Sequence, residues 1–482
     1  MNDKYEAVIG LEVHAQLLTD SKAFCGCSTL FGNPPNTNVC PVCLGHPGVL
    51  PGLNKKVVEF ISLMGLATNC EINEKSVFAR KNYFYPDLPK GYQISQYDKP
   101  ICENGYLNIH LNDDSIKKIG ITRIHMEEDA GKSIHDQAYE TLVDLNRCGV
   151  PLIEIVSEPD IRNAGEAVFY LTKIRQLVQY LEICDGNMEE GSLRCDANIS
   201  VRPKGQKEFG TKTEIKNMNS FRSLENAINF EIERQIEILE EDGKIVQETL
   251  LWNVGTNEAV SMRSKEEAHD YRYFPEPDLL PVVINDAWKK ELLLKLPELP
   301  EVRKDRFVGE YNLPVYDAEI LTQDRGIADY YEAVVKETKD YKSASNWVMS
   351  EILKILNEDK VNIKNFNVPA ENLGKLLNLI NEGTISGKMA KDIFPIMLKE
   401  HKSPEEIVKE KNLVQISDTL EIEKIIEKII SNHKTELKTY LEGKEKVFGF
   451  FIGQIMKETN GKANPRIVNE ILRKKLDKIK NK

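Results

Sequence analysis

Four cysteines near the start of the chain constrain its fold more than any other feature of the sequence. Two close pairs, Cys25/Cys27 and Cys40/Cys43, are separated by twelve residues that include Gly32, Pro34 and Pro35. Such pairs can close a tetrahedral thiolate site with Zn–S distances of about 2.3 Å, and the metal then holds a loop that has little core of its own. Because four thiolates leave no open coordination position, we predict that this zinc is structural.

The alternative is a pair of disulfides, or thiols that share no ligand. Only the first pair departs from common zinc spacing, because one residue lies between its cysteines where two to four are usual. The other five cysteines are scattered and odd in number, as expected of reduced thiols in a cytoplasm. The first residues lack the basic end and apolar stretch of a signal peptide, and no segment approaches the roughly twenty apolar residues of a membrane span. We therefore expect a cytoplasmic protein with no membrane partner.

A chain of 482 residues is long enough for about three domains. Its first part contains both short strand-like runs and stretches with helical periodicity, which predicts an α+β fold with strands around a few long helices. We interpret residues 1–295 as one mixed-sheet domain that carries the zinc-stapled loop. Strand patterns cover 5–13, 119–126, 152–156 and 197–201, and helical patterns cover 55–67, 164–181 and 220–241.

Strand patterns vanish from about Pro297 onward. Pro297, Pro300 and Pro314 indicate a linker, and helical periodicity follows. Ser403, with Glu406 three residues later, is a candidate helix N-cap. We predict two all-α domains, 296–402 and 403–482. The clearest helical patterns lie at 327–338, 345–357, 370–381 and 386–399.

The C-terminal tail is basic on a chain whose net charge is −12. From residue 446 to 482 there are ten Lys or Arg residues and three acidic ones, a net charge of +7. The overall charge argues against a protein coated by nucleic acid, but a local basic helix suits an RNA backbone. A solvated helix face is the alternative interpretation.

Acidic side chains on several predicted strands form a candidate metal site. Glu12 and His14 are two residues apart on the first strand and so share a face, although a structural histidine is the alternative. Glu127 belongs to a run of three carboxylates, which repel one another without a cation or solvent between them. Glu154 lies within an apolar strand, where a carboxylate needs a metal or a buried salt bridge. Oxygen ligands from several strands suit Mg²⁺.

A second candidate site combines basic and aromatic side chains. Lys81, Tyr83, Tyr85, Lys90 and Tyr92 fall within twelve residues of one another. Such a cluster can stack a nucleotide base or the end of a tRNA, or it can form a Tyr-rich edge of the core.

Taken together, these motifs resemble the B subunit of glutamyl/aspartyl-tRNA amidotransferases, the GatB family, over nearly the whole chain. All four cysteines of the zinc loop are present. The matching stretches are IGLEVHAQL (9–17), CPVCLGHPGVLPGLN (40–54), RKNYFYPDLPKGYQISQY (80–97), HMEEDAGK (125–132), VPLIEIVSEPD (150–160), GSLRCDANISVRP (191–203), TEIKNMNSF (213–221), DYRYFPEPDL (270–279) and NGKANPRIVNEIL (460–472).

The resemblance implies a carbon–nitrogen ligase that acts on Glu-tRNA(Gln), Asp-tRNA(Asn) or both. It also implies that residues 1–295 form a kinase-like catalytic cradle domain. ATP would convert the side-chain carboxylate into an acyl phosphate, which ammonia then converts into the amide. No glutaminase nucleophile is evident in this chain. Ammonia would therefore come from an amidase, the A subunit of the complex, and a small C subunit would complete a heterotrimer.

Carried onto this sequence, the resemblance assigns His14, Glu127 and Glu154 to Mg²⁺, with Glu12 beside them. Lys81 and Lys90 would line the passage to the site or steady phosphate charge. The basic tail would contact tRNA through Lys462, Arg466, Arg473, Lys474 and Lys475.

Two other classes of function stay open at this stage. One is a zinc-stapled tRNA adaptor whose acidic residues are structural. The other is a metal-dependent hydrolase, which is weaker because the predicted site has one histidine among carboxylates. Consumption of ATP only with misacylated tRNA distinguishes the ligase from the adaptor.

Overall fold

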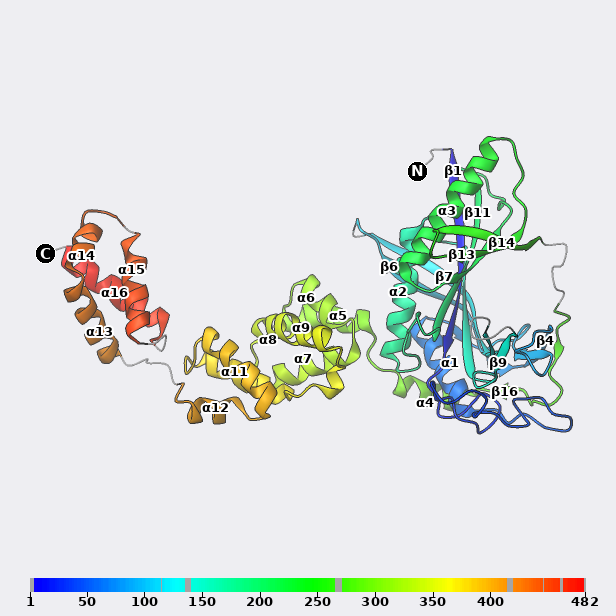
Figure 1. The fold of residues 1–482 in the computed structure, drawn as a ribbon, viewed down its shortest axis with the longest axis horizontal. Coiled ribbons are helices and arrows are strands. Elements are labelled where there is room, and N and C mark those ends of the chain that lie inside the picture. Colours follow the sequence, from blue (N-terminus) through cyan, green and yellow to red (C-terminus); the bar gives the residue numbers. More distant parts are fainter. Residues whose placement is uncertain are drawn as a thin grey trace. The chain divides into compact units, whose positions relative to one another are not determined.

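The computed structural model describes residues 4–113, 115–134, 140–264, 271–413, 419–444, 446–459 and 463–480. The chain divides into two compact units, Met1–Pro300 and Glu301–Lys482 (Figure 1). The first mixes strands with helices, and the second is helical over its described residues. None of the described helices combines the length and apolar character needed to cross a membrane.

A mixed sheet is the frame of the first unit. The described strands in it follow the order β14-β13-β12-β11-β1-β10-β7-β6-β2, and neighbours are antiparallel except β12 and β13, which are parallel. The α+β prediction is therefore confirmed. The strands are β1 (Tyr5–Gln16), β2 (Glu71–Ile72), β6 (Cys102–His110), β7 (Ile116–Glu128), β10 (Pro151–Ser157), β11 (Leu193–Pro203), β12 (Thr213–Met218), β13 (Glu248–Asn253) and β14 (Glu258–Ser264).

Three helices cover one face of this sheet (Figure 1). They are α1 (Lys55–Ala67), α2 (Ala164–Tyr180) and α3 (Phe221–Glu240), within one residue of the helical patterns in the sequence. Each begins at a polar N-cap whose side chain accepts a backbone N–H, namely Asn54, Asn163 and Ser220. Their apolar faces and the inward side chains of the strands form the core of this unit.

Alternation along β1 gives the sheet one packed face and one polar face. Leu11 and Val13 are fully buried in the core, whereas Glu12, His14 and Gln16 are partly exposed on the other side. Side chains alternate across a strand, so this pattern follows directly from the sequence. The polar face is where the candidate site lies.

Short elements surround the large sheet. The strands β4 (Ala79–Asn82), β5 (Tyr92–Ser95) and β15 (Phe274–Pro275) pair with one another, as do β3 (Lys75–Ser76) with β16 (Val282–Val283) and β8 (Lys132–Ile134) with β9 (Leu142–Asp144). Helix α4 (Asp286–Lys295) packs on α1 through the fully buried Leu292. The cysteine loop connects β1 to α1.

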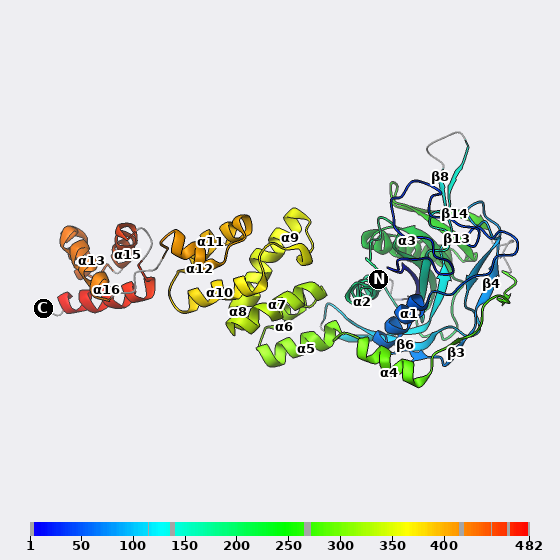
Figure 2. The ribbon, with the colours of Figure 1, turned by 90° about the horizontal axis from the view of Figure 1, so that it is seen from below.

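The second unit consists of helices joined by short connections (Figure 2). Helices occupy all four of the segments with the clearest helical patterns, and the predicted capping box of Ser403 and Glu406 is confirmed. The helices are α5 (Pro300–Tyr311), α6 (Val315–Leu321), α7 (Arg325–Thr338), α8 (Tyr341–Trp347), a π-helical turn (Val348–Ile352), α9 (Leu353–Asp359), a 3₁₀ turn (Ile363–Asn365), α10 (Ala370–Asn381), α11 (Gly387–Glu400), α12 (Pro404–Glu410), α13 (Thr419–Asn432), α14 (Lys434–Leu441), α15 (Val447–Glu458) and α16 (Pro465–Lys480).

The linker predicted around Pro297, Pro300 and Pro314 is wrong, because most of it is helical. Pro300 is the first residue of α5, and Pro314 is the N-cap of α6. Proline is tolerated at helix starts, since the missing N–H has no intrahelical partner there. Pro300 and Pro314 therefore mark helix beginnings, whereas Pro297 lies in the short non-helical stretch between α4 and α5.

Two hydrophobic clusters divide the second unit. The first includes Ile407 and Val408 of α12, with Leu413 packed against it. The second begins at Ile422 of α13 and ends at Leu476 of α16. Helix α12 therefore belongs with the preceding helices, so the packing divides after Leu413 and not at the predicted residue 403.

Candidate functional site

A row of ionisable side chains crosses four neighbouring strands on the polar face. His125 of β7 is paired in register with Glu154 of β10, Glu154 with His14 of β1, and His14 with Arg194 of β11. Residues opposite one another in antiparallel strands project to the same face. Glu127, two residues after His125, lies on that face as well. The sheet register thus brings together residues that are far apart in the sequence.

Glu154 is the centre of this row. Its Oε2 atom lies 3.4 Å from Nε2 of His14 and 3.4 Å from Nε2 of His125. Nε2 of His125 is also 3.6 Å from Oε1 of Glu127. His14, Glu127 and Glu154 each offer one ligand atom, and these atoms all lie within 4.8 Å of one another. Two carboxylates and one imidazole at this spacing fit a divalent cation, and carboxylate oxygens are the donors that Mg²⁺ prefers.

The mutual contacts shift the pKa of each group. Burial alone would lower the pKa of His125, but the charges of Glu154 and Glu127 outweigh it and raise that pKa to about 9. Burial would raise the pKa of Glu127, yet the ammonium of Lys81 and the contact with His125 lower it to about 2. Burial would raise the pKa of Glu154 as well, but its contacts with His125 and His14 outweigh burial and hold that pKa well below its usual range. Both carboxylates are therefore ionised at neutral pH.

Glu127 is held by side chains from the small sheet beside the site. Its Oε1 accepts from the Ser95 hydroxyl at 2.9 Å and lies 3.5 Å from Nζ of Lys81. Its Oε2 accepts from Nε2 of Gln93 at 3.1 Å. The strands β4 and β5 thus fix a buried carboxylate with three donors, as a charged group without solvent requires.

A cavity of about 330 Å³ opens on this row of side chains. Arg147 and Arg194 lie on its wall, and both contact Asp129, at 3.6 Å and 2.9 Å. The carboxylate of Asp129 also accepts from Gln16. Two guanidinium groups and one carboxylate leave this wall with an excess of positive charge. The residues around the cavity are His14, Lys81, Tyr83, Gln93, Glu127, Asp129, Ala130, Arg147, Leu152, Arg194, Asp196 and Lys216.

Glu12 lies one row away from the candidate metal ligands. It accepts a 2.9 Å hydrogen bond from Asn198. Burial, then the charge of Glu154, raises the pKa of Glu12. Glu12 is paired in register with Asp196 of β11, whose carboxylate is 2.6 Å from Nζ of Lys216. The structure places Glu12 beside the cluster of His14, Glu127 and Glu154 but outside that ligand group.

Lys81 and Lys90 face different cavities. Lys81 lines the cavity with His14 and Glu127, whereas Lys90 pairs with the buried Glu128 and lines a second cavity of about 80 Å³ next to the cysteine loop. Oε1 of Glu128 also accepts from the backbone N–H of Ile94 at 2.8 Å. The prediction that both lysines line the passage to the site or steady phosphate charge stays a prediction, and the structure places Lys81 beside Glu127 and Lys90 beside Glu128.

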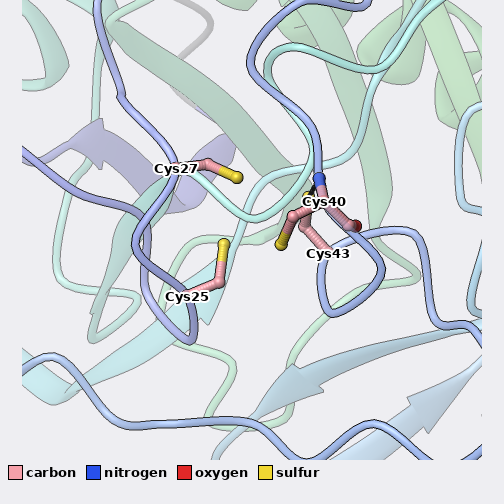
Figure 3. Close-up of side chains that lie close together, drawn as sticks. All are labelled: Cys25, Cys27, Cys40 and Cys43. Atoms are coloured by element: carbon pink, nitrogen blue, oxygen red, sulfur yellow. Dashed lines mark hydrogen bonds between the residues drawn. The ribbon is translucent and has the colours of Figure 1, made fainter.

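The four cysteines come together at the loop between β1 and α1. Figure 3 shows Cys25 and Cys27 on one segment of the loop, with Cys40 and Cys43 on another. The four Sγ atoms lie within 4.8 Å of one another, and those of Cys40 and Cys43 are 4.0 Å apart. A zinc tetrahedron with bonds of about 2.3 Å has edges of about 3.8 Å, so the arrangement fits such an ion. The thiol of Cys25 lowers the pKa of Cys43 to about 4, which favours a thiolate.

The predicted tRNA-binding residues lie at the C-terminal end of the chain. Lys462 is outside the described residues, as is the side chain of Arg466. On α16, Arg473 and Lys474 are exposed, and Lys474 lies 2.9 Å from Glu470. Lys475 is half-buried and pairs with Glu427 of α13. The exposed basic side chains of α16 are therefore Arg473 and Lys474, together with Lys478 and Lys480.

Sequence reasoning missed His125, Arg194 and Lys216. His125 precedes Glu127 by two residues, so the alternation used for Glu12 and His14 would have found it. Arg194 and Lys216 required the pairing order of β1, β11 and β12. That order depends on contacts between distant segments, which no local pattern specifies.

Comparison with known proteins places the chain in a family. It matches the model of the GatB/GatE catalytic domain over residues 7–290 and that of the GatB domain over residues 329–476. A Geobacter sulfurreducens protein, named as the B subunit of aspartyl/glutamyl-tRNA(Asn/Gln) amidotransferase, is 60% identical over 98% of this chain and 99% of its own length. The protein of the same name from Carboxydothermus hydrogenoformans is 58% identical over 99% of this chain and 100% of its own. This chain belongs to the family of aspartyl/glutamyl-tRNA(Asn/Gln) amidotransferase B subunits.

Proposed function

We propose that this chain is the subunit that activates and amidates the side chain of Glu-tRNA(Gln), Asp-tRNA(Asn) or both. A carboxylate resists attack by ammonia, and phosphorylation by ATP supplies a leaving group as an acyl phosphate. Ammonia then replaces phosphate and leaves the amide. The observation that supports this reaction best is the cavity whose wall joins His14 and Glu127, two members of the cluster with Glu154, to Arg147 and Arg194.

The acidic end of the cavity is the proposed metal site. His14, Glu127 and Glu154 would hold Mg²⁺, and a bound cation would offset the charge of nucleotide phosphates. His125 keeps the carboxylates of Glu127 and Glu154 in place through its Nε2 atom. In this arrangement Glu12 supports the neighbouring row and is not itself a ligand.

The basic end of the cavity is the proposed place for phosphate oxygens. Four cationic side chains (Lys81, Arg147, Arg194 and Lys216) and three carboxylates (Glu127, Asp129 and Asp196) line it. A divalent cation at the acidic end would increase this positive excess. A polyphosphate and a carboxylate substrate, both anionic, suit a cavity with that charge.

Three further assignments complete the proposal. Cys25, Cys27, Cys40 and Cys43 hold a structural zinc, and Lys90 steadies Glu128 beside the loop. The relatives are named as one subunit of an enzyme, which supports assembly with others. We propose that these are an amidase (the A subunit), which delivers ammonia, and a small C subunit. The protein works in the cytoplasm, where misacylated tRNA is made.

We also propose a division of labour along the chain. The cradle over residues 1–295 performs the chemistry, a helical domain follows, and the tail beyond Leu413 binds tRNA through Lys462, Arg466, Arg473, Lys474 and Lys475. The hydrophobic clusters of the second unit support placing this last boundary after Leu413.

The test is ATP turnover by the assembled complex. We expect ADP to form in step with amidated tRNA when Glu-tRNA(Gln) or Asp-tRNA(Asn) is supplied, and little ADP with the correctly charged tRNA. Amidation without ADP formation would contradict the acyl phosphate. Binding of tRNA with neither product would identify the chain as an adaptor.

A further inference from the structure

A buried lysine adjoins the four cysteines and has no acidic partner. Lys22 follows β1 and is fully enclosed, with 0% of its surface exposed. Its Nζ atom donates to the backbone carbonyl of Asn38 at 2.6 Å and lies 3.8 Å from Sγ of Cys43. Among the residues that the structure describes, no carboxylate forms an ion pair with Lys22.

A buried lysine without an ion pair to a carboxylate is unusual. An ammonium group taken out of water is costly unless an opposite charge lies beside it. Lys90, the other buried lysine next to the same cavity, obeys this rule by pairing with Glu128. Glu128 lines the cavity beside Lys22 as well, but its ion pair is with Lys90, and the negative group that Lys22 contacts is the sulfur of Cys43.

The cysteine cluster carries an excess of negative charge that would complement the ammonium of Lys22. Four thiolates around one Zn²⁺ carry a net charge of −2, and Cys43 is itself buried. Its Sγ atom already accepts from the backbone N–H of Cys40 at 3.2 Å. A second donor that brings a full positive charge would stabilise this sulfur as a thiolate and leave the buried group with a charge closer to zero.

The fold holds Lys22 in this position from both sides. Its backbone N–H donates to the carbonyl of Cys27 at 3.0 Å, and Ala23 N–H donates to the carbonyl of Gly149 at 2.9 Å. A Cβ atom at Gly149 would lie 3.6 Å from Cδ of Lys22 and 3.5 Å from Cβ of Cys43. Gly149 also has a positive φ of 81°, which glycine adopts without strain. Because Lys22 is fully enclosed, its ammonium cannot turn out into solvent.

We propose that Lys22 is the counter-charge of the four-cysteine metal site and sets how tightly the site retains zinc. The inference rests on the zinc assignment made above but concerns a residue outside the ligand set. Its contribution is electrostatic, so it depends on the positive charge and not on the hydrogen bond to Asn38 alone. Outer-shell partners of metal ligands commonly alter metal affinity by about 10–100-fold.

Zinc transfer from the full-length protein to an excess of a chromophoric chelator tests the proposal. Three variants separate charge from hydrogen bonding: Lys22→Met removes both, Lys22→Gln keeps a donor for the Asn38 carbonyl, and Lys22→Arg keeps the charge. Lys56→Met, at an exposed lysine of α1, is the matched control. Zinc content before transfer and the circular dichroism of each protein verify loading and folding.

We expect Lys22→Met and Lys22→Gln to release zinc at least about 10-fold faster than the unaltered protein. Lys22→Arg and Lys56→Met are expected to stay within about threefold of it. If Lys22→Gln releases zinc at the unaltered rate, Lys22 only anchors the loop through Asn38 and the proposal is wrong. Equally fast release from Lys22→Arg and Lys22→Gln would also overturn it, because packing and not charge would then control retention. If Lys22→Met does not fold, the comparison of Lys22→Arg with Lys22→Gln decides the question. An unaltered protein that folds but never contains zinc overturns the underlying zinc assignment instead.

Discussion

Glu154 illustrates how a single residue in this protein depends on its neighbours. The sequence places a carboxylate in an apolar strand, and the structure gives it His14 on one side and His125 on the other. Two imidazoles satisfy the buried charge, so the residue is compatible with the core that surrounds it. The same contacts place its carboxylate within 4.8 Å of the ligand atoms of His14 and Glu127, which line the cavity.

Replacing Glu154 with Gln tests the proposed metal site. The change keeps the size of the side chain but removes the charge between the two histidines, so cation binding should weaken and tRNA-dependent ADP formation should fall at least ~100-fold. Glutamine hydrolysis by the amidase partner should remain measurable, because its chemistry lies elsewhere.

Glu158→Gln is the matched control for that variant. Glu158 follows the same strand but is exposed and accepts from Thr122 instead of facing the cavity. Its ADP formation should stay near that of the unaltered protein. Full activity in Glu154→Gln, measured in the same assembled complex, would remove the acidic cluster from the mechanism.

At the scale of elements, the cysteine loop contains neither a helix nor a strand. Between β1 and α1 it forms only turns, bends and isolated bridges. Asn36 and Asn38 tie it to Asp144, the last residue of β9, and to Asn146 in the turn that follows. A metal at its centre would therefore contribute much of its order.

Cys43→Ser should lower zinc affinity by at least ~10-fold, because changes to residues that only contact metal ligands already have effects of that size. Backbone amides of residues 25–43 should then exchange with solvent faster, as native-state hydrogen exchange can measure. Cys70→Ser, at a partly buried cysteine hydrogen-bonded to Thr68, should change neither the zinc affinity nor the exchange of these amides. Normal folding and partner binding with lost activity in Cys43→Ser would show that the site is not merely structural.

Helices α6 and α8 are joined by a buried carboxylate. Asp317 accepts from the Ser345 hydroxyl at 2.5 Å and pairs with Lys342 at 2.6 Å. Burial would raise the pKa of Asp317, but the hydrogen bonds from Lys342 and Ser345 outweigh it and lower that pKa. The contact therefore stabilises the folded state above the ordinary pKa of aspartate and is lost as the pH falls through the lowered value.

Asp317→Asn should cost about 1 kcal/mol of unfolding free energy at pH 7, and the cost should shrink as the pH falls below about 4. Urea unfolding of the full-length chain at several pH values measures both effects. The exposed Asp392 of α11 is the control position, where the same substitution should change stability little at any pH. A cost that does not vary with pH would mean that the charge of Asp317 contributes nothing.

For the molecule as a whole, the proposed separation of chemistry from tRNA binding can be tested by truncation. The packing of α12 decides where to cut, since ending the chain at residue 402 would remove Ile407 and Val408 from the first hydrophobic cluster of the second unit. Ending it after Leu413 removes only the cluster that begins with α13.

Truncation after Leu413 should raise the KM for tRNA at least ~10-fold and flatten its dependence on salt, because phosphate contacts carry that dependence. Glutamine hydrolysis without tRNA should hardly change. A full-length variant with Arg473→Glu and Lys474→Glu should show the same trend without loss of the helices. Unchanged KM values in both proteins would mean that the basic tail is only a solvated helix face.

The sequence by itself determined the elements and much of the chemistry. Hydrophobic periodicity located α1, α2, α3 and most helices of the second unit, because local spacing controls which side chains share a face. Cysteine spacing indicated the loop, and the alternation around His14 indicated its face. These features depend only on neighbours along the chain.

Tertiary structure decided the rest. The row from His125 to Arg194 exists because β7, β10, β1 and β11 lie side by side in one register, and sheet order is set by packing between distant segments. The separation of Lys90 from Lys81 has the same origin. Lys22 carries no sequence signal at all, and only its burial in contact with Cys43, without an ion pair to a described carboxylate, gives it a role.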